Sequence, residues 1–264
     1  MSKQNLQNKK VAEMDTLISN VSLYLNEELC TRCGICALLC PKEAIELGPP
    51  EAAIDSENKN PRLTVDRDKC VLCGVCDAAC PFKAFQLTID GEHKVPILDL
   101  KGFPNFAKNI EIDNEKCNLC NTCATACPIG AIDIQNLKID IDRDHCITCK
   151  WCEDICVGEN INVENLLEGK IKIDASDCPG GCAICLEICP TDAIYEPEDE
   201  EPWSETDNIA VDEDHCIYCG ACAKACPVEG AISVKREKIN IEDIESLIWD
   251  EAKKKLQNEV VSRK

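Results

Sequence analysis

Residues 216–227 read CIYCGACAKACP, a run in which four cysteines have the spacing C-x2-C-x2-C-x3-C and a proline follows the last cysteine. The 24 cysteines of the 264-residue chain fall into six such groups of four, and five of the six keep this spacing. The groups are Cys30, Cys33, Cys36 and Cys40; Cys70, Cys73, Cys76 and Cys80; Cys117, Cys120, Cys123 and Cys127; Cys146, Cys149, Cys152 and Cys156; Cys178, Cys182, Cys185 and Cys189; and Cys216, Cys219, Cys222 and Cys226. Because no cysteine is left over, the repeat predicts that all of them are metal ligands.

The spacing is the run with which bacterial ferredoxins bind [4Fe-4S] clusters. Two-residue gaps wrap a tight loop around one cluster, so that three thiolates reach three irons and backbone amides point towards the sulfurs. The fourth cysteine lies on a short helix that leaves the loop and completes the neighbouring cluster, so the motifs function in pairs. The sequence therefore predicts six [4Fe-4S] clusters bound by the 24 cysteines.

The segments around the cysteine groups also repeat. A short alternating or β-branched stretch and an acidic step precede each group, and a pair such as Ala-Ile opens another strand after it, as in DNIAVDEDHCIYCGACAKACPVEGAISV at residues 207–234. Each unit is then a β-loop-α-β half of a ferredoxin, with strands too short to fold without the cluster. The predicted fold class is α+β: three tandem bacterial-type 2[4Fe-4S] ferredoxin domains with short antiparallel strands and short helices, followed by a C-terminal amphipathic helix.

The gaps between the groups indicate the domain limits. The shortest gap joins the third and fourth groups, and a stretch rich in Gly, Pro and Lys follows the second group. Sequential pairing gives an N-terminal segment at 1–21, ferredoxin domains at 22–90, 109–165 and 166–238, a linker at 91–108 and a C-terminal helix at 239–264. A nested arrangement, with one domain inserted in another, stays open because the gaps on both sides of the fourth group are similar in length.

Zinc and disulfides are the alternative uses of grouped cysteines. Zinc sites usually join two separated C-x2-C pairs, which would leave the third nearby cysteine of each group unexplained. C-x2-C turns rarely provide the geometry of a disulfide. His145 and His215 directly precede the first cysteine of their groups, and we expect them to pack or hydrogen-bond there rather than bind iron.

The fifth group has one extra residue between its first two cysteines. Read alone, its C-x3-C-x2-C spacing resembles the radical S-adenosylmethionine signature, which would make the chain an enzyme. Cys189, followed by Pro190, supplies the usual fourth ligand, however, and the six motifs leave no room for the required barrel. We expect the two glycines at 180–181 to absorb the extra residue.

The fourth group has Val157 in place of the proline that follows its last cysteine. Because proline is not a ligand, cluster binding should survive. The substitution predicts either a longer turn around Gly158 or altered hydrogen bonding at one cluster. Trp151, in the same loop, marks either a contact surface or a cover that keeps water from the cluster.

The chain is acidic, with 49 Asp and Glu residues against 28 Lys and Arg and a formal net charge of −21. This balance disfavours binding to nucleic acid or to anionic membranes. No apolar run approaches the roughly 20 residues of a membrane-spanning helix. The first residues do not resemble a secretory signal, so we expect a reducing cytoplasm, where free thiols persist.

The charge also bears on redox chemistry. With their 24 thiolates, six oxidised clusters would make the chain about 12 charges more negative. This field favours low reduction potentials and a partner that presents basic side chains around a neighbouring cluster. The sequence contains no Ser-His-Asp set, phosphate loop or dinucleotide fingerprint, so we expect no catalytic residues and no enzymatic activity of the chain alone.

Apolar residues mark both ends of the chain. Ile241, Ile244, Ile248, Ala252 and Leu256 recur at helical spacing, with acidic residues early and lysines late. This pattern predicts an amphipathic helix that either caps the last ferredoxin domain or docks onto a partner subunit. The N-terminal series Val11, Met14, Leu17 and Ile18 predicts a weaker segment of the same kind, unless that end is frayed.

From about residue 22 to residue 240 the chain resembles a polyferredoxin, a tandem array of 2[4Fe-4S] ferredoxin domains. CPGGCAICLEICPTDAI, the later HCIYCGACAKACPVEGAISVKREKIN and the terminal helix resemble the polyferredoxin subunits of archaeal formylmethanofuran dehydrogenase. Familiar members of that family carry eight motifs, whereas this chain has six, so it would be a shortened version or a relative.

This resemblance implies an electron-transfer subunit in a multisubunit complex with the tungsten or molybdenum enzyme that reduces carbon dioxide in methanogenesis. Two other functions stay open. One is the polyferredoxin of an energy-converting hydrogenase, and the other is an iron-sulfur cluster carrier or storage protein.

Overall fold

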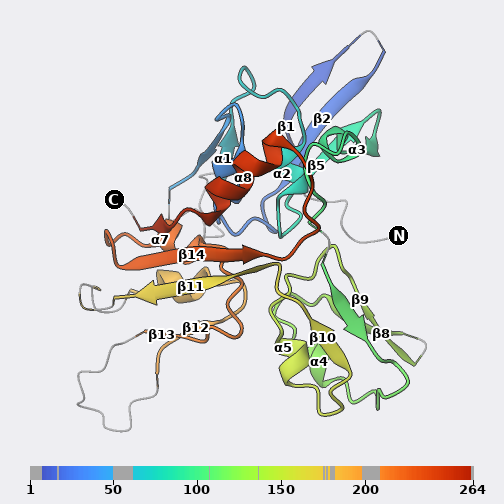
Figure 1. Cartoon of the computed structure of the whole chain (residues 1–264), viewed down its shortest axis with the longest axis vertical. Coiled ribbons are helices and arrows are strands. Elements are labelled where there is room, and N and C mark those ends of the chain that lie inside the picture. Colours follow the sequence, from blue (N-terminus) through green and yellow to red (C-terminus); the bar gives the residue numbers. More distant parts are fainter. Residues whose placement is uncertain are drawn as a thin grey trace. The chain divides into compact units, whose positions relative to one another are not determined.

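The computed structural model describes residues 8–16, 18–49, 62–106, 108–135, 137–174, 176, 178, 182–197 and 209–262. The chain divides into two compact units (Figure 1). The first contains Met1–Phe106 together with Ile241–Asn258, and the second contains Ala107–Asn240 together with Glu259–Lys264. A segment that follows all six cysteine groups therefore belongs to the unit that contains the first two.

One arrangement of four strands occurs three times. In each case the strand before one cysteine group pairs with the strand after the next group, and the two strands between the groups pair with each other, all antiparallel. The pairs are β2 (Asn20–Asn26) with β5 (Phe85–Ile89) and β3 (Ile45–Leu47) with β4 (Leu63–Val65); β7 (Ile110–Ile112) with β10 (Ile161–Val163) and β8 (Ile132–Gln135) with β9 (Lys138–Ile141); and β11 (Leu167–Ile173) with β14 (Ile232–Ile239) and β12 (Ile194–Tyr195) with β13 (Ala210–Val211). The groups are thus paired in sequence order, and the nested alternative is wrong.

A short helix carries the third cysteine of each group and ends at, or just before, the fourth. These helices are α1 (Ile35–Leu39), α2 (Val75–Ala78), α4 (Thr122–Ala126), α5 (Trp151–Asp154), α6 (Ile184–Glu187) and α7 (Ala221–Ala225). They contact each other in the same order: α1 with α2, α4 with α5, and α6 with α7. The predicted α+β fold of three dicluster ferredoxin regions with short strands and short helices is confirmed.

The cores of these regions are small and include the cysteines. In the middle region, Ile110, Ile132, Ile139, Ile141, Ile161 and Val163 form one buried cluster with Cys123 and Cys152. Every one of these apolar residues lies on a strand of the repeated arrangement. The strands therefore face their β-branched side chains towards the cysteine loops, as the alternating pattern predicts.

The N-terminal segment forms a strand, not a helix-like segment. β1 (Asn8–Asp15) pairs with the edge of β2, with a bulge between Lys10 and Ala12. With β5 and β6 (Glu92–His93) they form a sheet of order β1-β2-β5-β6. Val11 is half-buried, whereas Met14 and Ile18 are exposed, so these residues of the predicted series do not share one buried face. Leu17, part of the same predicted pattern, lies outside the described residues.

The predicted C-terminal helix is present, but it is shorter than expected and covers the first unit rather than the last ferredoxin region. α8 (Leu247–Gln257) begins after Ser246, so Ile241 and Ile244 precede it, and it packs beside α1 (Figure 1). The Ser246 hydroxyl donates to Gly102 O at 2.8 Å. After α8 the chain re-enters the second unit, where β15 (Val260–Val261) pairs with β14.

The segment predicted as a linker supplies the surface on which α8 packs. It contains β6, α3 (Pro96–Asp99) and two buried phenylalanines. Trp249, on α8, is 1% exposed and meets Phe103 and Phe106 edge to face, with ring centroids 5.3 and 6.1 Å apart. Its indole N–H donates to Asp243 Oδ1 at 2.5 Å. Within the described residues, no helix is both long enough and apolar enough to cross a membrane.

We predict that Trp249→Ala weakens the attachment of α8. Loss of the buried ring and its contacts should lower the free energy of opening of this helix by about 3–5 kcal/mol. Native-state hydrogen exchange of the α8 amides measures that free energy directly. Leu247→Ala is the matched control on the same helix, because Leu247 is 88% exposed and should change it by less than about 0.5 kcal/mol. Equal exchange rates in both variants would contradict the packing.

Candidate metal centres

Backbone conformation shapes the cysteine loops. In the five groups with regular spacing, the residues directly before and after the second cysteine both have positive φ, between 50° and 85°. They are Arg32 and Gly34, Leu72 and Gly74, Leu119 and Asn121, Thr148 and Lys150, and Tyr218 and Gly220. Left-handed residues separated by one position curl the chain so that successive amides face inward, which forms a concave site for anionic groups. Four thiolates around a cluster are such groups.

Backbone amides donate hydrogen bonds to the cysteine sulfurs at repeated positions. Leu119, Thr148 and Tyr218 each donate to the sulfur of the first cysteine in their loop, at 3.4 Å. Ala44, Ala84 and Ala131 each donate to the sulfur of the fourth cysteine of a group, at 3.3 Å. Such N–H···S bonds favour the thiolate form and tune a bound cluster. The expectation that amides point towards the sulfurs is confirmed at these six positions.

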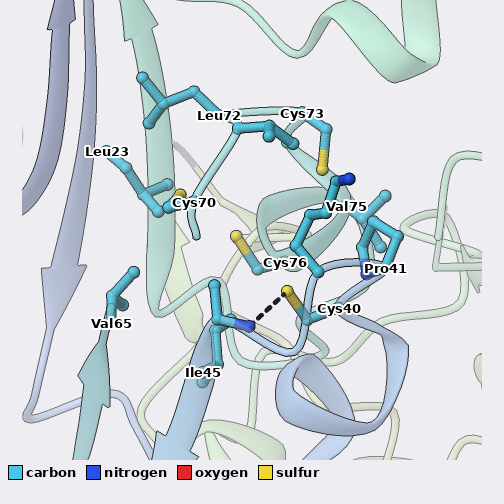
Figure 2. A pocket seen from close by; sticks show the side chains of 14 residues that line it. Leu23, Cys40, Pro41, Ile45, Val65, Cys70, Leu72, Cys73, Val75 and Cys76 are labelled. Carbon is cyan, nitrogen blue, oxygen red and sulfur yellow. Dashed lines mark hydrogen bonds between the residues drawn. The ribbon is translucent and has the colours of Figure 1, made fainter. Parts of the chain in front are cut away.

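The fourth cysteine of each group lies with the first three of its partner group. Figure 2 shows this arrangement at Cys70, Cys73, Cys76 and Cys40, with the bond from Ala44 to Cys40 drawn as a dashed line. Two further pockets are lined by Cys30, Cys33, Cys36 and Cys80, and by Cys117, Cys120, Cys123 and Cys156. These three pockets enclose about 410, 330 and 330 Å³, open solvent included.

The remaining cysteines show the same crossing through their electrostatic neighbours. Besides burial, the negative charge of Cys127 raises the pKa of the Cys146, Cys149 and Cys152 thiols. Burial and the charges of Cys178, Cys226 and Cys182 raise the pKa of the Cys185 thiol. In addition to burial, the charge of Cys189 likewise raises the pKa of the Cys216 and Cys222 thiols. Cys219 lies on the same loop as Cys216 and Cys222. The geometry thus groups the 24 cysteines into six sets of four, each set drawn from two motifs.

The chemistry of these sets fits a [4Fe-4S] cluster. Burial raises the pKa of the Cys30 and Cys216 thiols to about 12 and that of Cys149 to about 11. A buried thiolate is costly unless a cation compensates it, and an iron-sulfur core supplies that positive charge. All 24 cysteines lie within the described residues, and none forms a disulfide. Within those residues, no group of three or more His, Cys, Asp or Glu side chains is arranged to hold a single metal ion.

The fourth group differs in hydrogen bonding and not in the length of its turn. Glu159 N–H donates to Cys156 O at 3.0 Å, as Glu43 N–H donates to Cys40 O at 3.2 Å in the first group. Asn160 places its side-chain oxygen 2.6 Å from Cys156 Sγ and donates from its side-chain nitrogen to Asp113 O at 3.2 Å. The prediction of a longer turn is therefore wrong. Altered hydrogen bonding at a bound cluster stays a prediction, and Asn160 is the side chain that lies beside Cys156 Sγ.

Trp151 lies in a contact between the middle and last ferredoxin regions, both within the second unit. Its ring stacks on His215, with centroids 3.5 Å apart, and its indole N–H donates to Thr191 O at 2.7 Å. His215 is buried, with ring nitrogens 2.7 Å from Asp212 Oδ2 and 3.0 Å from Asp154 Oδ2. Of the two roles predicted for Trp151, a contact surface is the one observed, and its partner is this same chain. His215 packs and hydrogen-bonds, as expected.

Sequence reasoning missed Arg236, which stabilises the last cysteine loop. This arginine is 1% exposed, and it donates to Tyr218 O at 2.9 Å and to Cys219 O at 2.6 Å. A Cβ on Gly220 would lie 3.3 Å from its guanidinium. A signal was present, because Ile232, Val234 and Arg236 alternate along β14 and the two aliphatic residues point inward. The alternation therefore placed the charged group towards the cysteine loop.

One predicted feature of the fifth group lies outside the described residues. The two glycines at 180–181, expected to absorb the extra residue, are among the undescribed positions. Cys178, Cys182, Cys185 and Cys189 themselves are described, and Cys185 interacts electrostatically with Cys226 of the sixth group. The fifth group thus takes part in the crossed pairing like the others.

Comparison with known proteins agrees with this geometry. A family model described as a 4Fe-4S dicluster domain matches residues 29–84 and 177–230, and a second model with the same description matches residues 109–157. The three matches fall on the three pairs of cysteine groups.

Curated ferredoxins match parts of the chain. Ferredoxin 7Fe of Hydrogenibacillus schlegelii is 46% identical over 46 residues, covering 17% of this chain and 49% of the relative. One uncharacterized ferredoxin of Methanocaldococcus jannaschii is 51% identical over 53 residues, covering 20% of this chain and 29% of the relative. The chain thus spans half or less of these two relatives. Another ferredoxin of that organism is 35% identical over 68 residues, covering 25% of this chain and 97% of the relative.

A solved structure resembles nearly the whole chain. It is a chain of the formate dehydrogenase, heterodisulfide reductase and formylmethanofuran dehydrogenase complex from Methanospirillum hungatei, with a TM-score of 0.87 and 35% identity, covering 95% of this chain and 89% of that chain. Together with the three matches to dicluster models and the crossed cysteine sets, this similarity shows that the chain belongs to the 4Fe-4S dicluster ferredoxin family, with three dicluster regions in tandem.

Proposed function

We propose that the chain is a polyferredoxin that carries electrons within a multisubunit redox complex, with formylmethanofuran dehydrogenase as the enzyme it serves. The crossed grouping of 24 cysteines into six sets is the observation that carries the electron-transfer function. The choice of complex is supported by the 35% identity and 0.87 TM-score to a chain of the Methanospirillum hungatei complex. A reducing cytoplasm suits a chain whose 24 cysteines are free of disulfides.

Three of the proposed ligand sets follow the pockets, and the other three follow the electrostatic neighbours of the thiols. The six sets are Cys30, Cys33, Cys36 and Cys80; Cys70, Cys73, Cys76 and Cys40; Cys117, Cys120, Cys123 and Cys156; Cys146, Cys149, Cys152 and Cys127; Cys178, Cys182, Cys185 and Cys226; and Cys216, Cys219, Cys222 and Cys189. A bound [4Fe-4S] cluster supplies reversible one-electron exchange at each set. The chain itself supplies thiolates, amide donors and apolar cover, and we assign the substrate chemistry to partner subunits.

Side chains beside the cysteines also join the middle ferredoxin region to the last one. Trp151 comes directly before Cys152, His215 directly before Cys216, and Thr191 two residues after Cys189. The stack and hydrogen bond among these three residues therefore join the loop of the fourth group to the loops of the fifth and sixth. A fixed separation between adjacent sites benefits electron transfer. The entropic cost of placing the two sites is met when the chain folds, and it is not incurred again at each transfer.

Two double variants distinguish crossed from uncrossed cysteine sets. Cys117→Ala with Cys156→Ala removes two ligands from one set and should lose about four iron atoms, leaving five clusters unaltered. The matched control, Cys117→Ala with Cys127→Ala, removes one ligand from each of two sets and should perturb two clusters. Iron analysis and electron paramagnetic resonance of the reduced proteins distinguish these results. If the control pair perturbs one cluster and the test pair two, the crossing is wrong.

Two single variants test the contact of Trp151. Trp151→Ala should speed amide exchange around Thr191 and His215 by up to about tenfold, because an aromatic contact contributes about 0.5–1.5 kcal/mol. Trp151→Phe keeps a stacking ring but loses the indole donor. Its amide exchange rates should lie between those of the unmodified chain and those of Trp151→Ala. Tyr195→Ala is the control, since Tyr195 is half exposed in the same unit. Unchanged exchange in Trp151→Ala would show that the contact does not hold the two regions together.

A redox titration and copurification test the function itself. Purified anaerobically, the chain should accept about six electrons in a coulometric titration, most of them below about 0 mV, and should copurify with formylmethanofuran dehydrogenase subunits. Copurification with hydrogenase subunits instead would assign it to a different complex. Transfer of its clusters to metal-free acceptor proteins, without reversible reduction, would make it a cluster carrier and refute the electron-transfer function.

A further inference from the structure

The pocket of the third group lies at the surface. All 24 cysteines are among the described residues, and of these Cys120 alone is exposed. Its sulfur accepts a hydrogen bond from the Thr122 hydroxyl at 3.2 Å. By contrast, Cys216, Cys219, Cys222 and Cys226 are all buried. A cluster held at Cys120 would have the most direct access to a molecule outside the chain.

An exposed apolar side chain lies on the rim of this pocket. Val157 lines the pocket together with Cys156, and it is 86% exposed. Ile155, just before Cys156, is 42% exposed. A partner that covered the pocket would remove these apolar side chains from water.

The middle ferredoxin region, which contains this pocket, is acidic. Residues 108–164 contain eleven Asp and Glu against five Lys and Arg. Of the five basic residues, Lys116 pairs with Asp113 at 2.9 Å, and Lys108 and Arg143 donate to backbone carbonyls at 2.9 and 2.6 Å. Glu159, two residues after Val157, is exposed. The exposed Val157 therefore lies in a region of net negative charge, with Glu159 close to it in the chain.

We propose that this rim, defined by Cys120, Val157 and Glu159, is the surface where a partner protein exchanges electrons with the chain. The partner is a protein that presents basic side chains around a one-electron cofactor near its own surface. Charge complementarity would steer the encounter, and the exposed Val157 would exclude water from the contact. Redox encounters of this kind use small interfaces, which an exposed pocket rim can provide. The inference rests on the electron-transfer function proposed above and assigns one place to it.

The chain offers a closely matched pair of charge reversals. Glu159 and Glu43 are both exposed, both lie three residues after the last cysteine of a group, and have φ of 48° and 49°. In both, the backbone N–H donates to the carbonyl of that cysteine, at 3.0 and 3.2 Å. Glu159→Lys and Glu43→Lys therefore make the same chemical change in the same turn, but only Glu159 lies between two residues that line the third-group pocket, Gly158 and Asn160.

The test uses the cluster-loaded full chain and cytochrome c, a small basic haem protein, as the probe. Stopped-flow spectroscopy at low ionic strength measures the second-order rate of electron transfer from the reduced chain to the probe. We expect Glu159→Lys to slow this rate about three- to tenfold and Glu43→Lys to leave it nearly unchanged. Iron content and visible spectra, measured for both variants, confirm that the clusters are intact.

Carbodiimide cross-linking of the unmodified chain to cytochrome c provides a readout that needs no variant. The cross-linked carboxylates should map to residues 108–164, including Glu159. Equal slowing by both reversals, or cross-links confined to other parts of the chain, would overturn the site while leaving the electron-transfer function standing. If the unmodified chain is not reversibly reduced at all, the proposed function fails, and the site fails with it.

Discussion

The fourth cysteine of each motif leaves its own loop and enters the pocket of the partner motif, and the rest of the structure depends on this crossing. A single loop holds three sulfurs and one short helix, which is too little to form a core. Crossing brings two loops, two helices and two strand pairs around one interior. The buried thiols then need a cation, so binding of the clusters and folding of each region are linked. This linkage explains how a domain with so few aromatic residues acquires a stable centre.

The backbone does much of the positioning. Left-handed residues before and after the second cysteine turn the amides inward, and glycine adopts that conformation without steric cost at Gly34, Gly74 and Gly220. Asn121 and Lys150 adopt it in the third and fourth groups, where a side chain makes it less favourable. These two loops therefore have a non-glycine residue in the left-handed region on both sides of the second cysteine, whereas the other three regular loops have one on one side only. Local variation of this kind, together with Asn160 beside Cys156 Sγ, gives each site a different environment, which is how a protein separates cluster potentials.

Much of the fold and of the candidate site could be predicted from the sequence, because cysteine spacing encodes local geometry. The spacing predicted the ligand groups, the short helices and the strands beside each loop. The pairing partner remained open, since similar gaps on both sides of the fourth group fit two topologies. Local pattern also misled at the N-terminus, where a few spaced apolar residues suggested helical periodicity and the chain instead pairs with the exposed edge of β2.

Long-range packing was the part that the sequence did not reveal. The destination of α8 depends on Phe103 and Phe106, which lie far from Trp249 in the chain and within a segment that resembled a linker. The partner of Trp151 was equally hidden, because a tryptophan in a cysteine loop fits a cover and a contact equally well. Both cases concern how one region meets another segment, which no spacing rule describes.

Native mass spectrometry of the anaerobically purified chain tests the central claim, that the 24 cysteines hold six [4Fe-4S] clusters, most directly. The intact mass should exceed that of the polypeptide by six Fe4S4 units, with no fraction at a lower stoichiometry after full reconstitution. An excess corresponding to six zinc ions, or to clusters on only some of the sets, would contradict it.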